Sequence, residues 1–205
     1  LIVDSASIEG CGIGIAGRPV PPDVLGPKLS VSPGVFDHVD VGITASGVWA
    51  ASLQHVRFDH VSVRAIDLGV YRAGLKNVSS TGGTLPSKVK CKDANTYSSG
   101  IHPFEYFTMD SCSFMGNGAG GLSVSHVEPS EATGRISIGA SVFAENGGPG
   151  LSVEGRGVTV SGVLAYDNRG AGIALHQLAP AAPDSIVEST SVLNAEGGIV
   201  ITANS

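Results

Sequence analysis

The sequence predicts an all-β fold, a parallel β-helix in which short strands stack coil upon coil, and three observations support it. The segment Phe-Asp-His-Val at 36–39 returns at 58–61, a fixed offset in the numbering (58 − 36 = 22). A second unit, an asparagine with a glycine-rich turn and a short apolar strand, recurs at Asn117, Asn146, Asn168 and Asn194. No helical period extends beyond a few residues anywhere. A fixed period of this size with short alternating segments is typical of a solenoid.

The composition agrees with stacked short strands. Glycine makes up 29 of 205 residues, aromatic residues only 5% and charged residues 15%, against a usual charged share of about 25%. Many turns and small side chains suit a β-solenoid better than amphipathic helices. The net charge of −6 does not favour binding to nucleic acid or to an anionic membrane. No uninterrupted apolar run reaches the roughly 18 residues of a membrane-spanning helix.

The repeat spacing defines the expected coils. Successive asparagines differ in position by 146 − 117 = 29, 168 − 146 = 22 and 194 − 168 = 26, and aligning their strands stacks Leu122, Leu151, Ile173 and Ile199. We expect one domain over residues 1–205, with roughly seven to eight coils of about 22–29 residues each. Two stretches lack the repeat spacing and are expected to be irregular excursions. One, at about 18–34, holds five prolines, and the other, at about 79–100, is polar and glycine-rich.

The ends of the chain suggest a segment of a longer protein. The sequence does not begin with methionine, and residues 1–4 lack the basic region of a signal peptide. The end of a β-helix is an open strand edge. We therefore expect both ends to be covered by another chain or by flanking sequence.

The later repeat resembles a known family. Its pattern, Asn-x-x-Gly-x-Gly-[Ile/Leu]-x-[Val/Leu], is followed about ten residues later by a second apolar strand, at 158–160 and 186–187. This is similar to the right-handed parallel β-helix repeat of the pectin-lyase-like superfamily. That group includes pectate lyases, polygalacturonases, alginate lyases and epimerases, phage tailspikes and bacterial surface proteins. The resemblance implies a right-handed helix and a carbohydrate-related role, although one fold hosts many functions.

The recurring asparagines are expected to be structural. An asparagine in a tight turn tolerates positive φ and bonds to neighbouring amides, and stacked copies satisfy one another. An internal ladder is therefore favoured over a sugar-binding role.

His38 and His60 are equivalent residues of the two copies of the Phe-Asp-His-Val repeat. If Val39 and Val41 point inward, alternation sends His38, His60 and Asp40 outward, with the imidazoles about 4.8 Å apart in one column. Such a pair can polarise a proton, bind a substrate or share a metal ion, and surface stacking is the simpler interpretation. A metal site needs a third ligand, which the sequence does not place, so we predict no metal site and no cofactor. Both histidines are candidate substrate-binding residues.

The candidate catalytic residues are His102, Glu105 and His126. The first two lie in Gly-Ile-His-Pro-Phe-Glu at 100–105, which resembles the Gly-Ile-Asp-x-x-Pro segment before an Asn-Gly-turn coil in carbohydrate-active β-helix proteins. Uronate lyases and epimerases require a base, an acid and a cation that neutralises the substrate carboxylate, all on one exposed face. His102 or His126 can serve as the base, and the candidate cations are Lys88, Lys90 and Lys92.

Glycoside hydrolysis would instead require two carboxylates roughly 5–10 Å apart. Glu105 and Asp110 are the near pair of this region, and Asp110 is also a candidate substrate-binding residue. They are five positions apart in the chain (110 − 105 = 5). Successive side chains of a straight strand point to opposite faces, so this odd separation (their opposite parity) argues against a shared face.

Cys11, Cys91 and Cys112 form no Cys-x-x-Cys pair, so a zinc site is not expected. A Cys91–Cys112 disulfide and buried free thiols are both open alternatives.

Together these features predict a secreted or cell-surface β-helix that binds or processes polysaccharide. If it is an enzyme, it is a lyase, an epimerase or a glycoside hydrolase. The alternative is a non-catalytic element such as an adhesin, spike or stalk. The expected partner is a glycan surface, without nucleic acid and without membrane insertion.

Overall fold

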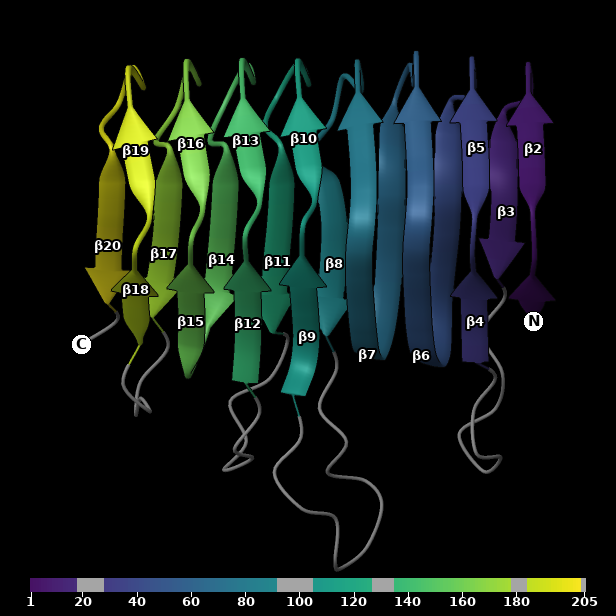
Figure 1. The fold of residues 1–205 in the computed structure, drawn as a ribbon, viewed down its shortest axis with the longest axis horizontal. Helices are drawn as coiled ribbons and strands as arrows, with labels where there is room; N and C mark the ends of the chain where they lie inside the picture. The colour runs from purple at the N-terminus through teal and green to yellow at the C-terminus, as the bar shows by residue number, and fades with distance from the viewer. Residues whose placement is uncertain (18–27, 92–104, 127–134, 178–183, 204–205) are drawn as a thin grey trace, which may run out of the picture.

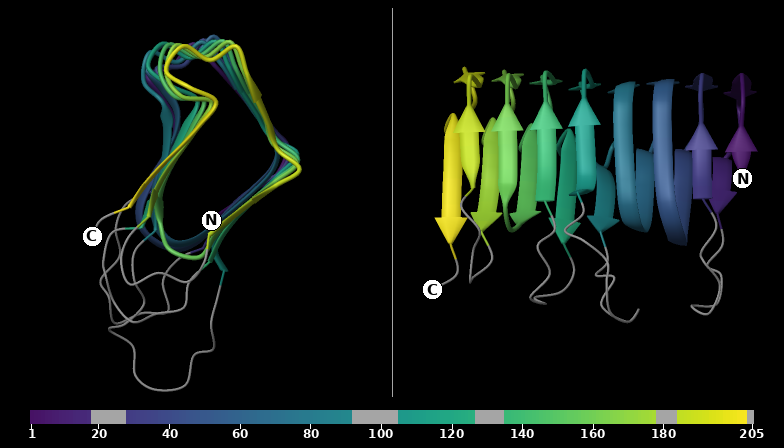
Figure 2. Two further views of the ribbon diagram at one scale, coloured as in Figure 1. Left: turned by 90° about the vertical axis from the view of Figure 1, so that its left-hand side faces the viewer. Right: turned by 60° about the horizontal axis from the view of Figure 1, so that its bottom comes forward.

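The computed structural model describes residues 1–17, 28–91, 105–126, 135–177 and 184–203. Within these ranges every regular element is a β-strand, and the strands pair in parallel in one 20-stranded sheet that winds into coils (Figure 1). Viewed along the axis, the coils superimpose with their corners aligned (Figure 2). The predicted fold class, an all-β parallel β-helix, is confirmed. None of the described residues forms a helix long and apolar enough to cross a membrane.

Each coil contributes strands to three columns. The first column contains β1 (Ile2–Val3), β4 (Lys28–Val31), β9 (Glu105–Asp110), β12 (Arg135–Gly139), β15 (Val158–Ser161) and β18 (Ser185–Val187). The second contains β2 (Ala6–Glu9), β5 (Gly34–Asp37), β10 (Ser113–Met115), β13 (Val142–Ala144), β16 (Leu164–Tyr166) and β19 (Thr190–Val192). The third contains β3 (Ile13–Gly17), β8 (Ser87–Cys91), β11 (Leu122–His126), β14 (Leu151–Gly155), β17 (Ile173–Gln177) and β20 (Ile199–Ala203). Two long strands, β6 (Val41–Asp59) and β7 (Arg64–Thr81), run through the corners and contribute to all three columns.

The strand pairings give the length of each coil. The second column pairs in the order β2–β5–β6–β7–β10–β13–β16–β19. Most offsets between paired positions fall within the predicted range, such as Ala6 to Gly34 (34 − 6 = 28). The exception is the longer step from Ser79 to Ser113 (113 − 79 = 34), because this coil contains the long segment between β8 and β9.

Parts of the two expected excursions are regular strands. Lys28–Val31 is β4, which pairs with β1 and β6, and Ser87–Cys91 is β8, which pairs with β7 and β11. The lysines of β8 alternate with Val89, which is fully buried, so the strand keeps the period of two despite its charges. Residues 18–27 and 92–100 of those excursions lie outside the described residues.

Stacked aromatic rings fill the core beside the second column. Phe36 and Phe58 stack at 4.9 Å between ring centroids, and Phe114 and Phe143 at 5.7 Å. The buried Ser80 lies between the two pairs in the same column. Gly42 leaves room for the Phe58 ring, because a Cβ there would come within 2.3 Å of that ring.

The predicted asparagine ladder is confirmed. The Nδ2 group of each asparagine donates to the Oδ1 atom of the next, at 2.9 Å from Asn117 to Asn146 and 2.8 Å from Asn146 to Asn168 and from Asn168 to Asn194. The backbone N–H groups of Asn117, Asn146 and Asn168 donate to the same oxygens. At the other end the Gly83 N–H donates to Asn117 Oδ1 at 3.2 Å.

The coils also turn at corners where the backbone takes a positive φ. One corner column, directly after the second-column strand, holds Gly10, His38, His60, Gly82, Gly116, Glu145, Asp167 and Leu193. Glycine adopts this left-handed conformation freely, and histidine and aspartate are enriched in it among other residues. The two candidate histidines are therefore corner residues.

Candidate functional site

Two histidines and an aspartate meet at one corner of two adjacent coils. His38 follows β5 and His60 follows the second-column part of β6. Their rings stack with centroids 4.6 Å apart and planes inclined by 21°, which is the spacing that neighbouring strands impose on equivalent residues. The predicted histidine column is confirmed.

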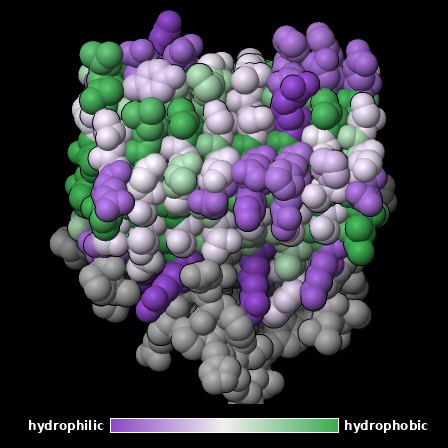
Figure 3. Space-filling view, viewed as in Figure 1, coloured by the Kyte–Doolittle hydropathy of each residue, from purple (hydrophilic) through white to green (hydrophobic). Residues whose placement is uncertain are grey.

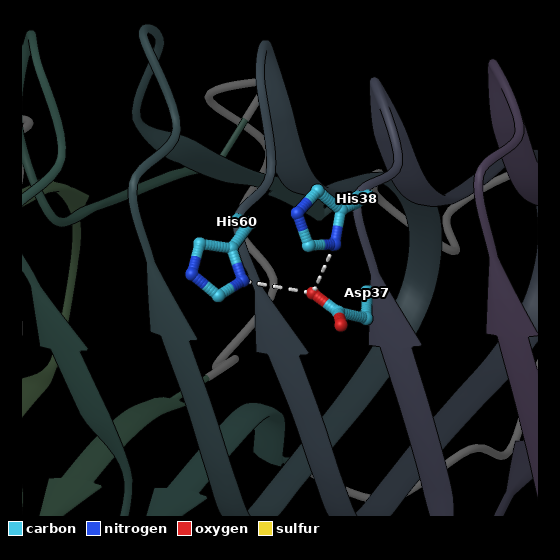
Figure 4. A group of neighbouring side chains, drawn as sticks. All are labelled: Asp37, His38 and His60. Carbon is cyan, nitrogen blue, oxygen red and sulfur yellow. Dashed lines mark hydrogen bonds and ion pairs between the residues drawn. The ribbon is translucent and has the colours of Figure 1, made fainter.

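Asp37 joins the two rings. The Nδ1 atoms of His38 and His60 each lie 2.9 Å from its Oδ1 atom (Figure 4). Because a carboxylate only accepts, both rings carry their proton on Nδ1 when they donate to it. The three side chains bring their ligand atoms within 4.8 Å of one another, which places a carboxylate and two imidazoles at one point.

The cluster faces solvent, and the two rings stabilise the charged form of its carboxylate. The side chains of His38 and His60 are 62% and 70% exposed, and that of Asp37 is 34% exposed. The hydrogen bond from His60, together with that from His38 and the charge of both rings, holds the pKa of Asp37 below its usual value.

The neighbouring carboxylates have other partners. Asp59, the register partner of Asp37, forms an ion pair with Arg57 at 2.6 Å. Asp40, which the sequence pattern placed beside the histidines, accepts a hydrogen bond from Ser62 Oγ. The carboxylate that contacts the imidazoles is therefore Asp37, one residue before the corner.

A groove of about 410 Å³ runs across the first column. Residues from four successive coils line it: Ser52, Gln54, Gly74, Leu75, Lys76, Thr108, Met109, Asp110, Ser137 and Gly139. A row of hydroxyl groups crosses this face from Ser30 to Ser185, interrupted at Gly74, and is formed by Ser30, Ser52, Thr108, Ser137, Thr159 and Ser185. Figure 3 shows hydrophilic side chains over the middle coils of this face and apolar ones toward its left edge.

The groove holds both signs of charge. Lys76 and Asp110 are register partners on β7 and β9, and both are exposed. Asp110 accepts a hydrogen bond from Ser111 Oγ at 2.9 Å. Gly74 interrupts the hydroxyl row, which leaves a space between Ser52 and Thr108 that a larger residue would fill.

The three candidate catalytic residues are only partly described. His102 lies outside the described residues, as do the side chains of Glu105 and His126. By backbone position Glu105 begins β9 and His126 ends β11. In an earlier coil, the long strand β7 runs through the same corner without interruption. Its Val70 lies in the register column of His126. Ala73, three residues later, lies in the register column of Phe107. The backbones of Glu105 and His126 therefore border one corner column of the β-helix.

The strand that carries Glu105 and Asp110 is not straight. Glu105 pairs with Arg135 while Phe107 pairs with Ile136, a register shift that adds one residue to β9. The parity argument against a shared face for Glu105 and Asp110 assumed a straight strand, and it does not hold across this shift.

The candidate cations do not all approach the groove. Lys88 lies on β8, in the third column, where it pairs with Asp67 and Ser123. Asp110 lies on β9, in the first column. Lys92 is outside the described residues, and so is the side chain of Lys90. Lys88 and Asp110 therefore belong to different faces.

Cys112 is a buried free thiol, and Cys11 is a half-buried one. The disulfide alternative for Cys112 is therefore not adopted. Burial raises the pKa of the Cys112 thiol to about 11.

A scan against protein families, a search of curated proteins and a search of solved structures each find no match to this chain.

Some functional candidates escaped the sequence analysis. Asp37 carried a signal, since it precedes His38 within the repeated Phe-Asp-His, as Asp59 precedes His60. The lining residues Ser52, Gln54, Lys76, Thr108 and Ser137 carried none, because they become neighbours only through the strand register.

Proposed function

We propose that this protein is an extracellular or cell-surface β-helix that binds polysaccharide in the first-column groove. The observation that carries the proposal is the groove itself, in which polar side chains from four successive coils line one continuous surface. A chain-like ligand suits a site that repeats along the axis of a solenoid.

The chemistry of the lining fits sugars. Hydroxyl groups and the Gln54 amide both donate and accept hydrogen bonds, as sugar hydroxyls do. Stacked coils repeat these groups about every 4.8 Å. Lys76 and Asp110 add a cation for a uronate carboxylate and an acceptor for neutral sugar hydroxyls.

The described lining residues favour binding over turnover. Hydrolysis needs two carboxylates roughly 5–10 Å apart, and Asp110 is the carboxylate among the described residues that line the groove. A binding module, as in an adhesin or spike, requires no such pair. This supports the non-catalytic interpretation of polysaccharide interaction.

Processing of the bound chain is the second candidate. It is favoured by the backbone positions of Glu105 and His126 at one corner, where β9 leads directly to Asp110. A lyase or an epimerase would use His126 as base and the groove to hold the chain. Product formation from any polysaccharide that binds, absent in a His126→Ala variant, would support this candidate over binding alone.

We also propose kinship with the pectin-lyase-like superfamily. The support is the combination of three-column coils with an internal asparagine ladder at the turns before β11, β14, β17 and β20.

The binding proposal is tested by filling the groove. A Cβ at Gly74 meets only Thr108 Oγ1, at 3.4 Å, so Gly74→Trp can project into the groove without disturbing the strands. The matched control is Gly69→Trp, on the third-column part of β7, where a Cβ meets nothing closer than 3.7 Å. Affinity electrophoresis against uronate-rich and neutral polysaccharides is expected to show at least about a tenfold loss for Gly74→Trp alone. Absence of binding by the native protein, or an equal loss in both variants, contradicts the proposal.

A further inference from the structure

We propose that Asp37, His38 and His60 bind a divalent transition-metal ion, such as Zn²⁺, Ni²⁺ or Cu²⁺, at the corner of two adjacent coils. The sequence pattern supplied two histidines without a third ligand. The structure supplies the third, because Asp37 Oδ1 lies 2.9 Å from the Nδ1 atom of each ring.

Asp37 Oδ1 already lies at a coordination-shell separation from the Nδ1 atom of each ring. Imidazole nitrogen and carboxylate oxygen bind zinc at about 2.0–2.2 Å. Adjacent ligands at such distances in tetrahedral or octahedral geometry lie about 2.8–3.6 Å from one another. The Oδ1–Nδ1 separations are 2.9 Å, and one ligand atom from each of the three side chains lies within 4.8 Å of the others. A metal ion therefore needs small rotations of exposed side chains and no movement of the backbone.

The fold keeps the two imidazoles together. Both histidines occupy the left-handed corner, with φ of 51° for His38 and 48° for His60, and Asp37 ends β5 directly before it. The register of β5 with β6 sets the distance between the two rings. The ligands are thus arranged by the solenoid itself before any ion arrives.

The donor set selects the class of ion. Imidazole suits zinc, copper and nickel, whereas magnesium and calcium prefer oxygen ligands alone. Three protein ligands on an exposed corner leave positions for water or for a group on a bound molecule. Asp59 and Asp40 already have Arg57 and Ser62 as partners, so Asp37 is the carboxylate left to the ion.

Binding exchanges hydrogen bonds for metal bonds. In the metal-free protein each ring donates its Nδ1 proton to Asp37. A neutral imidazole moves that proton to Nε2 when Nδ1 binds the ion, and an imidazolium releases one proton to solvent.

Calorimetric titration with ZnCl₂, and separately with NiCl₂, tests the site. The native protein is expected to bind one ion with a defined stoichiometry. The double variant His38→Gly/His60→Gly places in this corner the residue that Gly10 and Gly82 provide in the coils on either side, so the backbone is preserved. It is expected to bind at least about tenfold more weakly.

A matched control separates the cluster from histidines in general. His55 also occupies a left-handed corner, with φ of 53°, and its Nδ1 atom lies 3.3 Å from the Asn77 amide nitrogen. His55→Gly makes the same chemical change and is expected to leave the affinity unchanged. Equal weakening in this variant and the double variant, or no weakening in the double variant, overturns the proposal.

An NMR measurement does not depend on how well the variants fold. On addition of Zn²⁺ to the native protein, the imidazole signals of His38 and His60 are expected to shift, while those of His55 and His176 stay in place. Shifts confined to other histidines, or no shift at millimolar Zn²⁺, overturn it. The cluster shares no residue with the groove, so the polysaccharide proposal stands or fails independently.

Discussion

At the scale of single residues, the buried asparagines stabilise the coils through a closed set of hydrogen bonds. Asn146 is fully buried, donates to Asn168 Oδ1 and to the Phe114 carbonyl, and accepts from both nitrogens of Asn117. Asn194 ends the ladder, and its amide donates to the Ala165 and Val192 carbonyls. The central and the terminal asparagine of the ladder therefore differ in burial, since Asn146 is fully buried and Asn194 is half-buried.

We expect Asn146→Ala to lower the free energy of unfolding by about 3 kcal/mol or more, since it leaves several buried groups unsatisfied. Asn194→Ala should cost less, because Asn194 is only half-buried and water can replace part of the hydrogen bonding that is lost there. Urea denaturation of both variants measures the difference, and equal losses would contradict the ladder as the source of stability.

The Cys112 thiol gives a pH-dependent stability. Its pKa is raised by burial from 9.0 to about 11, so the folded thiol stays protonated after the unfolded one ionises. Its contribution is complete below about pH 9 and is lost as the pH rises from about 9 to about 11. The loss at this residue is at most about 2–3 kcal/mol.

The comparison with Cys112→Val isolates this effect from other groups that titrate there. Valine is the natural control, since Val78 occupies the same place in the preceding coil. We expect the variant to lose less stability than the native protein between pH 9 and 11. Identical pH profiles from urea denaturation would show that the thiol is not the source.

The residue scale also shows why Asp37 was missed as a partner of the histidines. Strict alternation along a strand places His38 and Asp40 on one side and Asp37 on the other. The positive φ of His38 ends that alternation, so Asp37 and His38 contact each other although they are adjacent in sequence. The stacking of His38 on His60 was predictable because it depends only on the period of the repeat.

At the scale of strands, ring packing explains why some glycines cannot be replaced. A Cβ at Gly42 would lie 2.3 Å from the Phe58 ring and 2.7 Å from the Ala65 carbonyl oxygen. At Gly74 the nearest atom would be Thr108 Oγ1, at 3.4 Å. One glycine faces the core and the other faces the groove.

We therefore expect Gly42→Ala to destabilise the protein by about 1–3 kcal/mol through overpacking. Gly74→Ala should change the free energy of unfolding by less than about 0.5 kcal/mol. Thermal or urea unfolding of the two alanine variants tests this pair. Similar losses in both would mean that the Phe58 ring does not determine the packing at Gly42.

The third-column strands after residue 104, together with β15 and β18, could be predicted from sequence. The expected stack of Leu122, Leu151, Ile173 and Ile199 is the register that the structure adopts. The same reasoning missed β4 and β8, because prolines and lysines around them resemble loop composition while the inward residues Leu29 and Val89 remain buried. Charged residues on the outward face therefore do not indicate whether a segment forms a strand of the β-helix.

At the scale of the whole molecule, the groove exists only because distant segments stack. Ser52, Thr108 and Ser137 come from coils whose offsets in sequence are unequal, so no local pattern brings them together. The sequence pattern therefore pointed to the excursion at about 79–100 and the coil that follows it, and the structure adds a second surface on the regular strands.

The charges of the groove should distinguish acidic from neutral ligands. If the bound polysaccharide is a polyuronate, Lys76→Ala should weaken binding by at least about tenfold and Asp110→Ala should have a smaller effect or strengthen it, because opposite charges attract and like charges repel. A neutral glycan should reverse this order. Affinity measured at two salt concentrations provides the control, since only the polyuronate interaction should weaken strongly with salt.

The most direct test of the polysaccharide proposal is to map the bound ligand on the folded protein by NMR. On titration with an oligosaccharide from a polymer that binds, backbone amide shifts are expected at Ser52, Gly74, Thr108 and Ser137, in the first column. Ser123 and Ser152, in the third column, should not move. Shifts confined to the third column, or no saturable shift with any glycan, would contradict the assignment of this groove as the binding site.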